Sequence, residues 1–299
     1  MPHISLAAEK LGTLWGVPVT NSLLTAWLVL GLLTVLSILA TRKLSLIPST
    51  GQSMAELLVG GLYDFFSSIV GKYIKQFFPL LASLFIFIIT ANWVGLLPGV
   101  GTIGFFHTDA QAVVQEEAVS AMPAVDSLTV EEHVVEVVPE GHAVAPGITK
   151  EVSTATPIEA GAQEAKFTPL FRGATADINM TLALAMIAVI AIQYFGFRAL
   201  GFQYTTRFIS FKSPINFFVG LLELVSEISK VISFAFRLFG NIFAGEVLLT
   251  VMAFLMPFVI PLPFLMLELF VGFIQALVFS MLTGVFLSVA VSHGEGEHH

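Results

Sequence analysis

The chain alternates long stretches without charged residues and short segments that carry charges. Residues 22–40 contain no Lys, Arg, Asp or Glu and are closed by a basic pair. Residues 77–106 are likewise uncharged, and Pro98 marks the point where a helix should end. About 20 apolar residues cross the hydrocarbon core of a bilayer as a helix. The pattern therefore predicts transmembrane helices at 22–40 and 77–98.

The same pattern predicts three further helices in the second half of the chain. A third transmembrane helix is expected at 178–198. Residues 213–255 contain no proline after Pro214, and as one helix they would measure about 64 Å, at 1.5 Å per residue. Since the hydrocarbon core is only about 30 Å thick, this helix must tilt, bend or begin outside it. Prolines at 257, 261 and 263 predict a turn, after which 264–291 returns as the final transmembrane helix.

The remaining segments are polar or mixed. Residues 53–75 combine acidic and basic residues with Leu and Phe at roughly helical spacing, which predicts an amphipathic helix at the membrane interface. Residues 1–21 form an amino-terminal segment, and 292–299 form a polar tail. Residues 104–168 have no sustained periodicity, so this insertion could be disordered or could form short strands such as 133–138.

Composition sets the fold class. The 299 residues are 56% hydrophobic and only 11% charged, with a mean hydropathy of +0.89, whereas soluble domains carry about 25% charged residues. We therefore expect an all-α membrane protein with about five transmembrane helices, an interfacial helix, and a last pair of long, tilted helices forming a hairpin. The chain has no cysteine, which excludes disulfides and thiolate metal sites.

The charges are distributed unevenly. The net charge is -8, and the insertion 104–168 alone accounts for -9, so the rest of the chain is nearly neutral. No basic stripe suited to nucleic acid occurs. The basic residues between the predicted helices would lie on one side of the membrane if there are five spans: Arg42, Lys43, Lys72, Lys75, Arg198, Arg207 and Lys212. By the positive-inside rule this side, with the carboxyl terminus, is the cytoplasm, and the insertion is extracytoplasmic.

Ionisable residues inside the last two predicted helices are the candidates for function, because a charge in the bilayer is costly without a partner or water. They are Glu223, Glu227, Lys230, Arg237, Glu246 and Glu268. Arg237 has no acidic residue three or four positions away on either side, so its helix cannot neutralise it. Arginine stays protonated in proteins. The counter-charge of Arg237 must therefore come from elsewhere.

Helical spacing relates the other candidates to Arg237. Asn241 is one turn away and shares its face, whereas Glu246 is nine residues away on the opposite face, so the two charges cannot form a simple pair. On the next helix, Glu268 and Gln275 are seven residues apart and nearly in phase. Both side chains can therefore point into one polar seam.

Two interpretations stay open for the other polar residues. Glu223, Glu227 and Lys230 could form a solvated or interfacial ladder, or could belong to an ion pathway. The same ambiguity applies to three polar residues near the ends of other helices, which could cap helices or bond between them, or could take part in transport: Asn92, Asp177 and Asn179.

Four strings resemble subunit a of the F-type ATP synthases, the membrane stator and proton channel. They are SKVISFAFRLFGNIFAGEVLL at 229–249, NWVGLLP at 92–98, FRGATADIN at 171–179 and IQALVFSMLTGVFLS at 274–288. The resemblance implies a non-catalytic ion-channel subunit with two offset half-channels that deliver protons to a rotating c-ring. It also implies a bacterial plasma membrane location, with the c-ring, the subunit b stalk, other synthase subunits and lipid as partners, and no cofactor or nucleic acid.

The resemblance assigns roles to individual residues. Arg237 matches the essential cation that faces the ring. The residues implied for the outer half-channel and proton relay are Glu246, Glu268, Gln275, Asn241, Asn92, Asp177 and Asn179. Those implied for the inner half-channel are Glu223, Lys230 and Ser233. Gly95 stands where some relatives carry an acid, so this turn has no assigned role.

Two other functions are compatible with parts of the sequence. A stand-alone secondary transporter or channel could use Arg237 as an anion site, but such proteins usually contain two related halves, and no internal repeat occurs here. A purely structural scaffold would leave the buried charges unexplained. No GxxxxGK nucleotide-binding loop is present.

Overall fold

The computed structural model describes residues 8–14, 16–42, 48–107, 166–201, 203–206, 208, 214–256 and 259–292. The chain divides into two compact units, the first comprising Met1–Phe105 with Pro169–His299 and the second Phe106–Thr168. Most of the second unit, including the possible strand at 133–138, lies outside the described residues.

The first unit is built from long helices. In chain order the α-helices are α1 (Asn21–Thr41), α2 (Thr50–Val70), α3 (Ile74–Gly95), α5 (Ile178–Leu200), α6 (Gln203–Thr206), α7 (Pro214–Leu255) and α8 (Pro261–Ser292). The 3-10 turns are η1 (Gly71–Tyr73) and η2 (Ala174–Ala176). Among the described residues, five helical stretches are long and apolar enough to cross a membrane. The chain is thus an all-α integral membrane protein, as predicted.

Short strands flank the helices. They are β1 (Lys10–Leu14), β2 (Val17–Thr20), β3 (Pro98–Gly101), β4 (Gly104–His107) and β5 (Lys166–Pro169). β1 and β2 pair antiparallel, and β4 pairs with β5. The amino-terminal hairpin was not predicted. It leads directly into α1, where the Thr20 hydroxyl accepts a hydrogen bond from the Leu23 N–H and caps the helix.

The predicted interfacial helix and the second transmembrane helix are almost continuous. α2 ends at Val70 and α3 begins at Ile74, with only η1 between them. Gly71 adopts a φ of 64°, a left-handed conformation that favours glycine and ends α2. One face of α2, formed by Leu62, Phe66 and Val70 at four-residue spacing, is buried in the core.

α7 and α8 are the longest helices, with 42 and 32 residues. At 1.5 Å per residue, α7 extends about 63 Å, roughly twice the hydrocarbon core. The predicted turn is shorter than expected, because Pro261 and Pro263 belong to the first turn of α8. Proline is tolerated there, since its missing N–H would have no helical partner.

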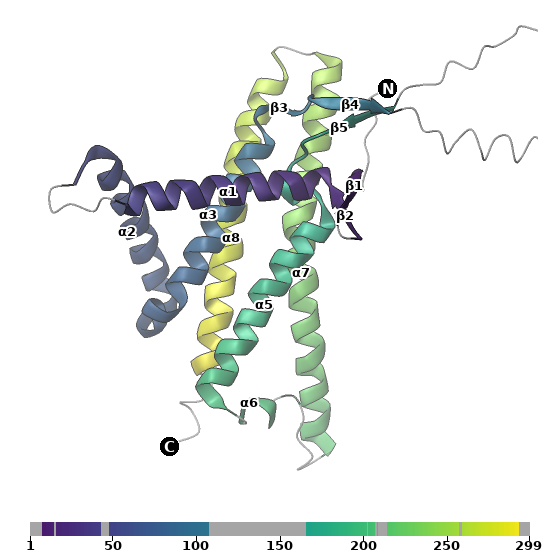
Figure 1. Ribbon diagram of the computed structural model, residues 1–299. Helices are drawn as coiled ribbons and strands as arrows, with labels where there is room; N and C mark the ends of the chain where they lie inside the picture. The colour runs from purple at the N-terminus through teal and green to yellow at the C-terminus, as the bar shows by residue number, and fades with distance from the viewer. Residues whose placement is uncertain are drawn as a thin grey trace, which may run out of the picture. The chain divides into compact units, whose positions relative to one another are not determined.

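Figure 1 shows α1 running across the direction of α3, α5, α7 and α8. α1 and the long helices therefore cannot all stand along one membrane normal. If α1 crosses the bilayer upright, α7 and α8 are strongly inclined, which agrees with the length of α7. The tilt itself stays a prediction.

Small residues bring α3 and α8 close together in the core. A Cβ added to Gly284 would lie 3.2 Å from side-chain atoms of Leu81 and Val70, and one added to Gly272 would lie 3.2 Å from the Cβ of Asn92. Such residues let membrane helices approach closely enough for van der Waals packing and hydrogen bonding. This packing fixes α8, which carries two of the predicted site residues.

Candidate functional site

Arg237 lies on the exposed face of α7, whereas its neighbours Phe234 and Leu238 are buried in the core. No acid or other hydrogen-bond acceptor of the described residues contacts its guanidinium. The helix thus presents a permanent positive charge outward, away from the rest of the chain. This agrees with the expectation that its counter-charge comes from elsewhere.

Beside Arg237, α7 and α8 share the polar seam that the spacing predicted. The Asn241 Nδ2 atom donates a 2.6 Å hydrogen bond to Oε1 of Gln275. Gln275 is buried, and its own Nε2 group has no partner among the described residues. Asn241 is exposed at the surface that also carries Arg237. The Asn241–Gln275 bond therefore connects this surface to the interior of the hairpin.

Glu268 enters the same interface about two turns earlier on α8. It is only 7% exposed, and its carboxylate occupies the space that a side chain at Gly245 would fill. In the part of the chain that the structure describes, no group pairs with this carboxylate, and Oε1 is fully buried. A carboxyl group placed in this way needs a proton, water or a cation from another molecule. Glu268 is therefore suited to exchanging a proton.

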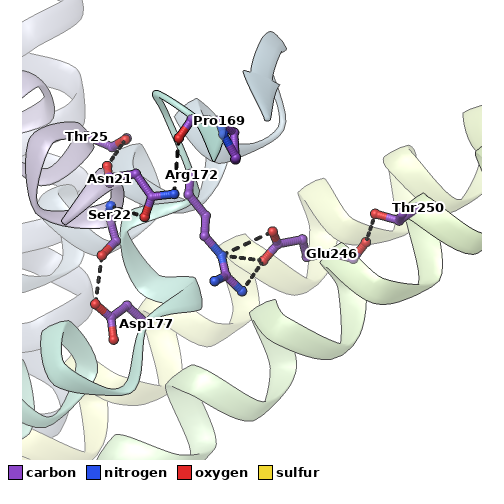
Figure 2. Close-up of polar contacts among 8 residues, drawn as sticks. All are labelled: Asn21, Ser22, Thr25, Pro169, Arg172, Asp177, Glu246 and Thr250. Atoms are coloured by element: carbon purple, nitrogen blue, oxygen red, sulfur yellow. Dashed lines mark hydrogen bonds and ion pairs between the residues drawn. The ribbon is translucent and has the colours of Figure 1, made fainter. Parts of the chain in front are cut away.

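Glu246 follows Gly245 but has a partner within the chain. Figure 2 shows the Arg172 guanidinium pointing at the Glu246 carboxylate, with Nε 3.2 Å from Oε1 and both Nε and Nη2 3.3 Å from Oε2. Arg172 is not among the residues predicted from the sequence, although it lies in the FRGATADIN string. An arginine in the apolar surroundings of that string was the signal that could have identified it.

Asp177 serves a structural role at the start of α5. Its Oδ1 accepts a 3.0 Å hydrogen bond from the backbone N–H of Asn179, which caps the helix. Its Oδ2 accepts a 2.7 Å bond from the Ser22 hydroxyl of α1 (Figure 2). Asn179 is exposed and bonds to Asp177 through its own amide. These contacts support the capping interpretation and leave a transport role untested.

Asn92 uses both ends of its amide between helices. The Thr175 hydroxyl donates a 2.7 Å bond to Oδ1, and Nδ2 donates a 3.2 Å bond to the Gly272 carbonyl. Asn92 thereby joins α3 to η2 and to α8. The neighbouring Gly95 lies so close to the Gly173 backbone that an added Cβ would be 3.2 Å from its Cα. An acid at Gly95 would thus force the two segments apart.

Two of the charged residues in the first half of α7 pair with each other. Glu227 is only 7% exposed and forms a 2.6 Å ion pair with Lys230. The Lys230 ammonium also lies 4.9 Å from the centre of the Phe286 ring on α8, a cation–π distance. Glu223 is half-buried, and Ser233 is exposed near Arg237. The apolar surroundings explain the pairing, since an unpaired charge there would be costly.

Metal binding receives no support from the described part of the chain. No group of three or more His, Asp or Glu residues there is placed to hold an ion. The histidines of the polar tail lie outside the described residues.

Comparison with known proteins places these features in one family. The sequence pattern of the ATP synthase A chain family matches residues 23–288. The chain belongs to this ATP synthase A chain family. ATP synthase subunit a of Gloeobacter violaceus is 30% identical over 283 residues, covering 93% of this chain and 86% of the relative. The protein of the same name from Geotalea uraniireducens is 28% identical, covering 90% and 86%, and that from Trichlorobacter lovleyi is 28% identical, covering 89% and 85%.

The family match confirms the resemblance drawn from the four strings. It extends from the start of α1 to near the end of α8, and so includes every residue of the candidate site. Arg172, which the structure pairs with Glu246, also lies inside the matched region.

Proposed function

We propose that this chain is the proton-translocating stator subunit in the membrane sector of an F-type ATP synthase. It provides two offset half-channels to a rotating c-ring, so that proton flow is coupled to ATP synthesis. The observation that carries this proposal is the exposed Arg237, which has no counter-charge among the described residues. Family membership supplies the second support.

The physical role of Arg237 follows from its fixed charge. A ring carboxylate passing Arg237 is stabilised in its ionised form, whereas a carboxylate turned toward lipid must be neutral, because a bare charge is too costly there. The ring can therefore rotate only after taking up a proton. Arg237 also separates the two half-channels and prevents a continuous proton path. Each charge that crosses 100 mV contributes about 2.3 kcal/mol, which biases the direction.

The polar residues fall into two groups around Arg237. Those proposed for the outer half-channel are Glu246, Glu268, Gln275, Asn241, Asn92, Asp177 and Asn179. Those proposed for the inner half-channel are Glu223, Lys230 and Ser233. The members on α7 lie on opposite sides of Arg237 along that helix, with the inner group before it and Asn241 and Glu246 after it, which supports their assignment to different half-channels.

The chain is proposed to be non-catalytic, with nucleotide chemistry in partner subunits. Its partners are the c-ring, the subunit b stalk, the other synthase subunits and membrane lipid. We propose a bacterial plasma membrane location with the carboxyl terminus in the cytoplasm and the acidic insertion outside.

ATP-driven proton pumping in membranes that contain the assembled complex tests this function. Arg237→Ala and Arg237→Lys should both abolish pumping, and the alanine variant should leak protons, because the separating charge is gone. Lysine should fail since its compact ammonium does not replace the planar guanidinium. Arg42→Ala is the matched control, because Arg42 is an exposed arginine at the end of α1, away from the proposed site. Normal pumping by Arg237→Ala would refute the proposal.

A further inference from the structure

Arg172 is a buried arginine that the proposed function has not used. It lies between β5 and η2, outside the membrane-spanning helices, and is only 6% exposed. Long charged side chains are almost never this buried without partners. Arg172 reaches across to α7, and its guanidinium points at Glu246 (Figure 2). A loop residue thus places a permanent positive charge against an acid of the proposed half-channel.

The contact has the geometry of an oriented pair. Nε lies 3.2 Å from one carboxylate oxygen of Glu246, and Nε and Nη2 lie 3.3 Å from the other. A planar guanidinium that contacts both oxygens fixes the orientation of a carboxylate as well as its charge. The Glu246 side chain is still 41% exposed. It can therefore exchange protons with water or a neighbouring acid while it stays aligned.

The two acids at this end of the seam differ in one respect. Glu246 has a cation, whereas Glu268 has no partner among the described residues. The Glu268 carboxylate packs against Gly245, the residue before Glu246 on α7. An opposite charge nearby stabilises the ionised form of an acid. Glu246 can thus release a proton and remain as an anion more readily than Glu268 can.

We propose that Arg172 is a positioning residue for proton uptake, which orients Glu246 and stabilises the carboxylate left behind when Glu246 passes its proton toward Glu268. In this step the O–H bond of Glu246 breaks and an O–H bond forms on the Glu268 carboxylate. The negative charge moves to Glu246, where it lies against the guanidinium. The difference between the two acids then favours proton movement into the seam. The inference rests on the proposed function and adds a residue to it.

Arg172 and Glu246 variants in the assembled synthase test this role. The measurement is proton-driven ATP synthesis in membrane vesicles, divided by the amount of assembled complex. Arg172→Gln should lower the rate about tenfold, less than the roughly 10²–10⁴-fold of a proton-transfer group itself, because Arg172 acts only through Glu246. Arg172→Lys should lower the rate less than Arg172→Gln, by about threefold, because it keeps the positive charge but loses the planar fork that orients Glu246. Glu246→Gln should lower the rate at least as much as Arg172→Gln.

The double variant separates positioning from a purely structural role. If Arg172 acts through Glu246, adding Arg172→Gln to Glu246→Gln causes no further loss. A further loss of about tenfold in that background would overturn the inference, as would unchanged activity of Arg172→Gln. If the glutamine variant does not assemble, Arg172→Lys takes its place, and a loss by Arg172→Lys that is repeated in full in the Glu246→Gln background counts against the proposal. Proton pumping by Arg237→Ala is measured in parallel, and normal pumping by that variant refutes the proposed function itself. If Arg237→Ala does not pump but the Arg172 and Glu246 variants show no coupling, only this inference is refuted.

Discussion

Replacing Asn92 by leucine would test whether this residue joins helices or conducts protons. Leucine has the same branching of its side-chain heavy atoms but can make neither of the two amide contacts, the 2.7 Å bond from the Thr175 hydroxyl and the 3.2 Å bond to the Gly272 carbonyl. The Gly272 carbonyl keeps its own helical N–H partner in α8. Only the Thr175 hydroxyl is then left without its acceptor.

The structure sets the size of the effect. Side-chain hydrogen bonds between membrane helices contribute about 0.6 kcal/mol on average and up to about 1.7 kcal/mol. Two such bonds give an expected loss of about 1–3 kcal/mol in the free energy of unfolding for Asn92→Leu. Thr175→Val removes only one of them and should cost about 0.6–1.7 kcal/mol. The loss in the double variant should be smaller than the sum of the two single losses by about 0.6–1.7 kcal/mol, because the Asn92–Thr175 bond is lost only once.

The unfolding free energies can be measured by titrating the purified chain from mild detergent into SDS and following helicity by circular dichroism. Proton pumping by the assembled complex is measured on the same variants. Asn216→Leu is the matched control, because Asn216 is exposed at the start of α7 and lies outside the proposed site. A coupling energy below about 0.3 kcal/mol, within the usual additivity of independent sites, together with lost pumping, would show that Asn92 acts in transport and not as a bridge.

Two further substitutions test contacts of the same region. Gly245→Ala should displace the Glu268 carboxylate and lower proton pumping. Because this carboxylate is the end of a flexible side chain, the free energy of unfolding should fall by only about 0.5–1.5 kcal/mol. Gly31→Ala, in open space on α1, is the control, and equal pumping by both variants would contradict the contact. Ser22→Ala removes the 2.7 Å bond to Asp177 and should cost about 1–3 kcal/mol in SDS titration. An unchanged unfolding curve for Ser22→Ala would mean that Asp177 does not depend on α1.

The helices were predictable because the bilayer imposes their length and composition. α1 and α5 coincide closely with the uncharged stretches, since a charge inside either would be costly. The boundaries that differ are those set by local geometry. Pro261 and Pro263 looked like a turn but fit the first turn of α8, where helical N–H groups have no partners. The β1–β2 hairpin could not be predicted from the sequence, because two strands this short have too few residues to show a periodic pattern.

The chemistry was predictable only along a single helix. Spacing placed Asn241 on the face of Arg237, and Glu268 with Gln275 on one face of α8, because helical phase is a local property. The Arg172–Glu246 pair joins residues 74 positions apart and depends on the path of the loop between β5 and η2. The same limit applies to Glu227, whose burial beneath neighbouring helices no local pattern reveals.

Glu223 apart, the charges of the last two helices divide into those the chain neutralises and those it does not. The neutralised ones form two ion pairs, Glu227 with Lys230 and Glu246 with Arg172. Arg237 and Glu268 have neither an ion-pair partner nor a side-chain hydrogen bond among the described residues. An unpaired charge in the membrane is retained only where something outside the chain offsets its cost. For Glu268 that partner can be the transferred proton, and for Arg237, which cannot lose its own proton, it has to be an anion on another molecule. The proposed ring carboxylate and the proton that it carries meet both requirements at once.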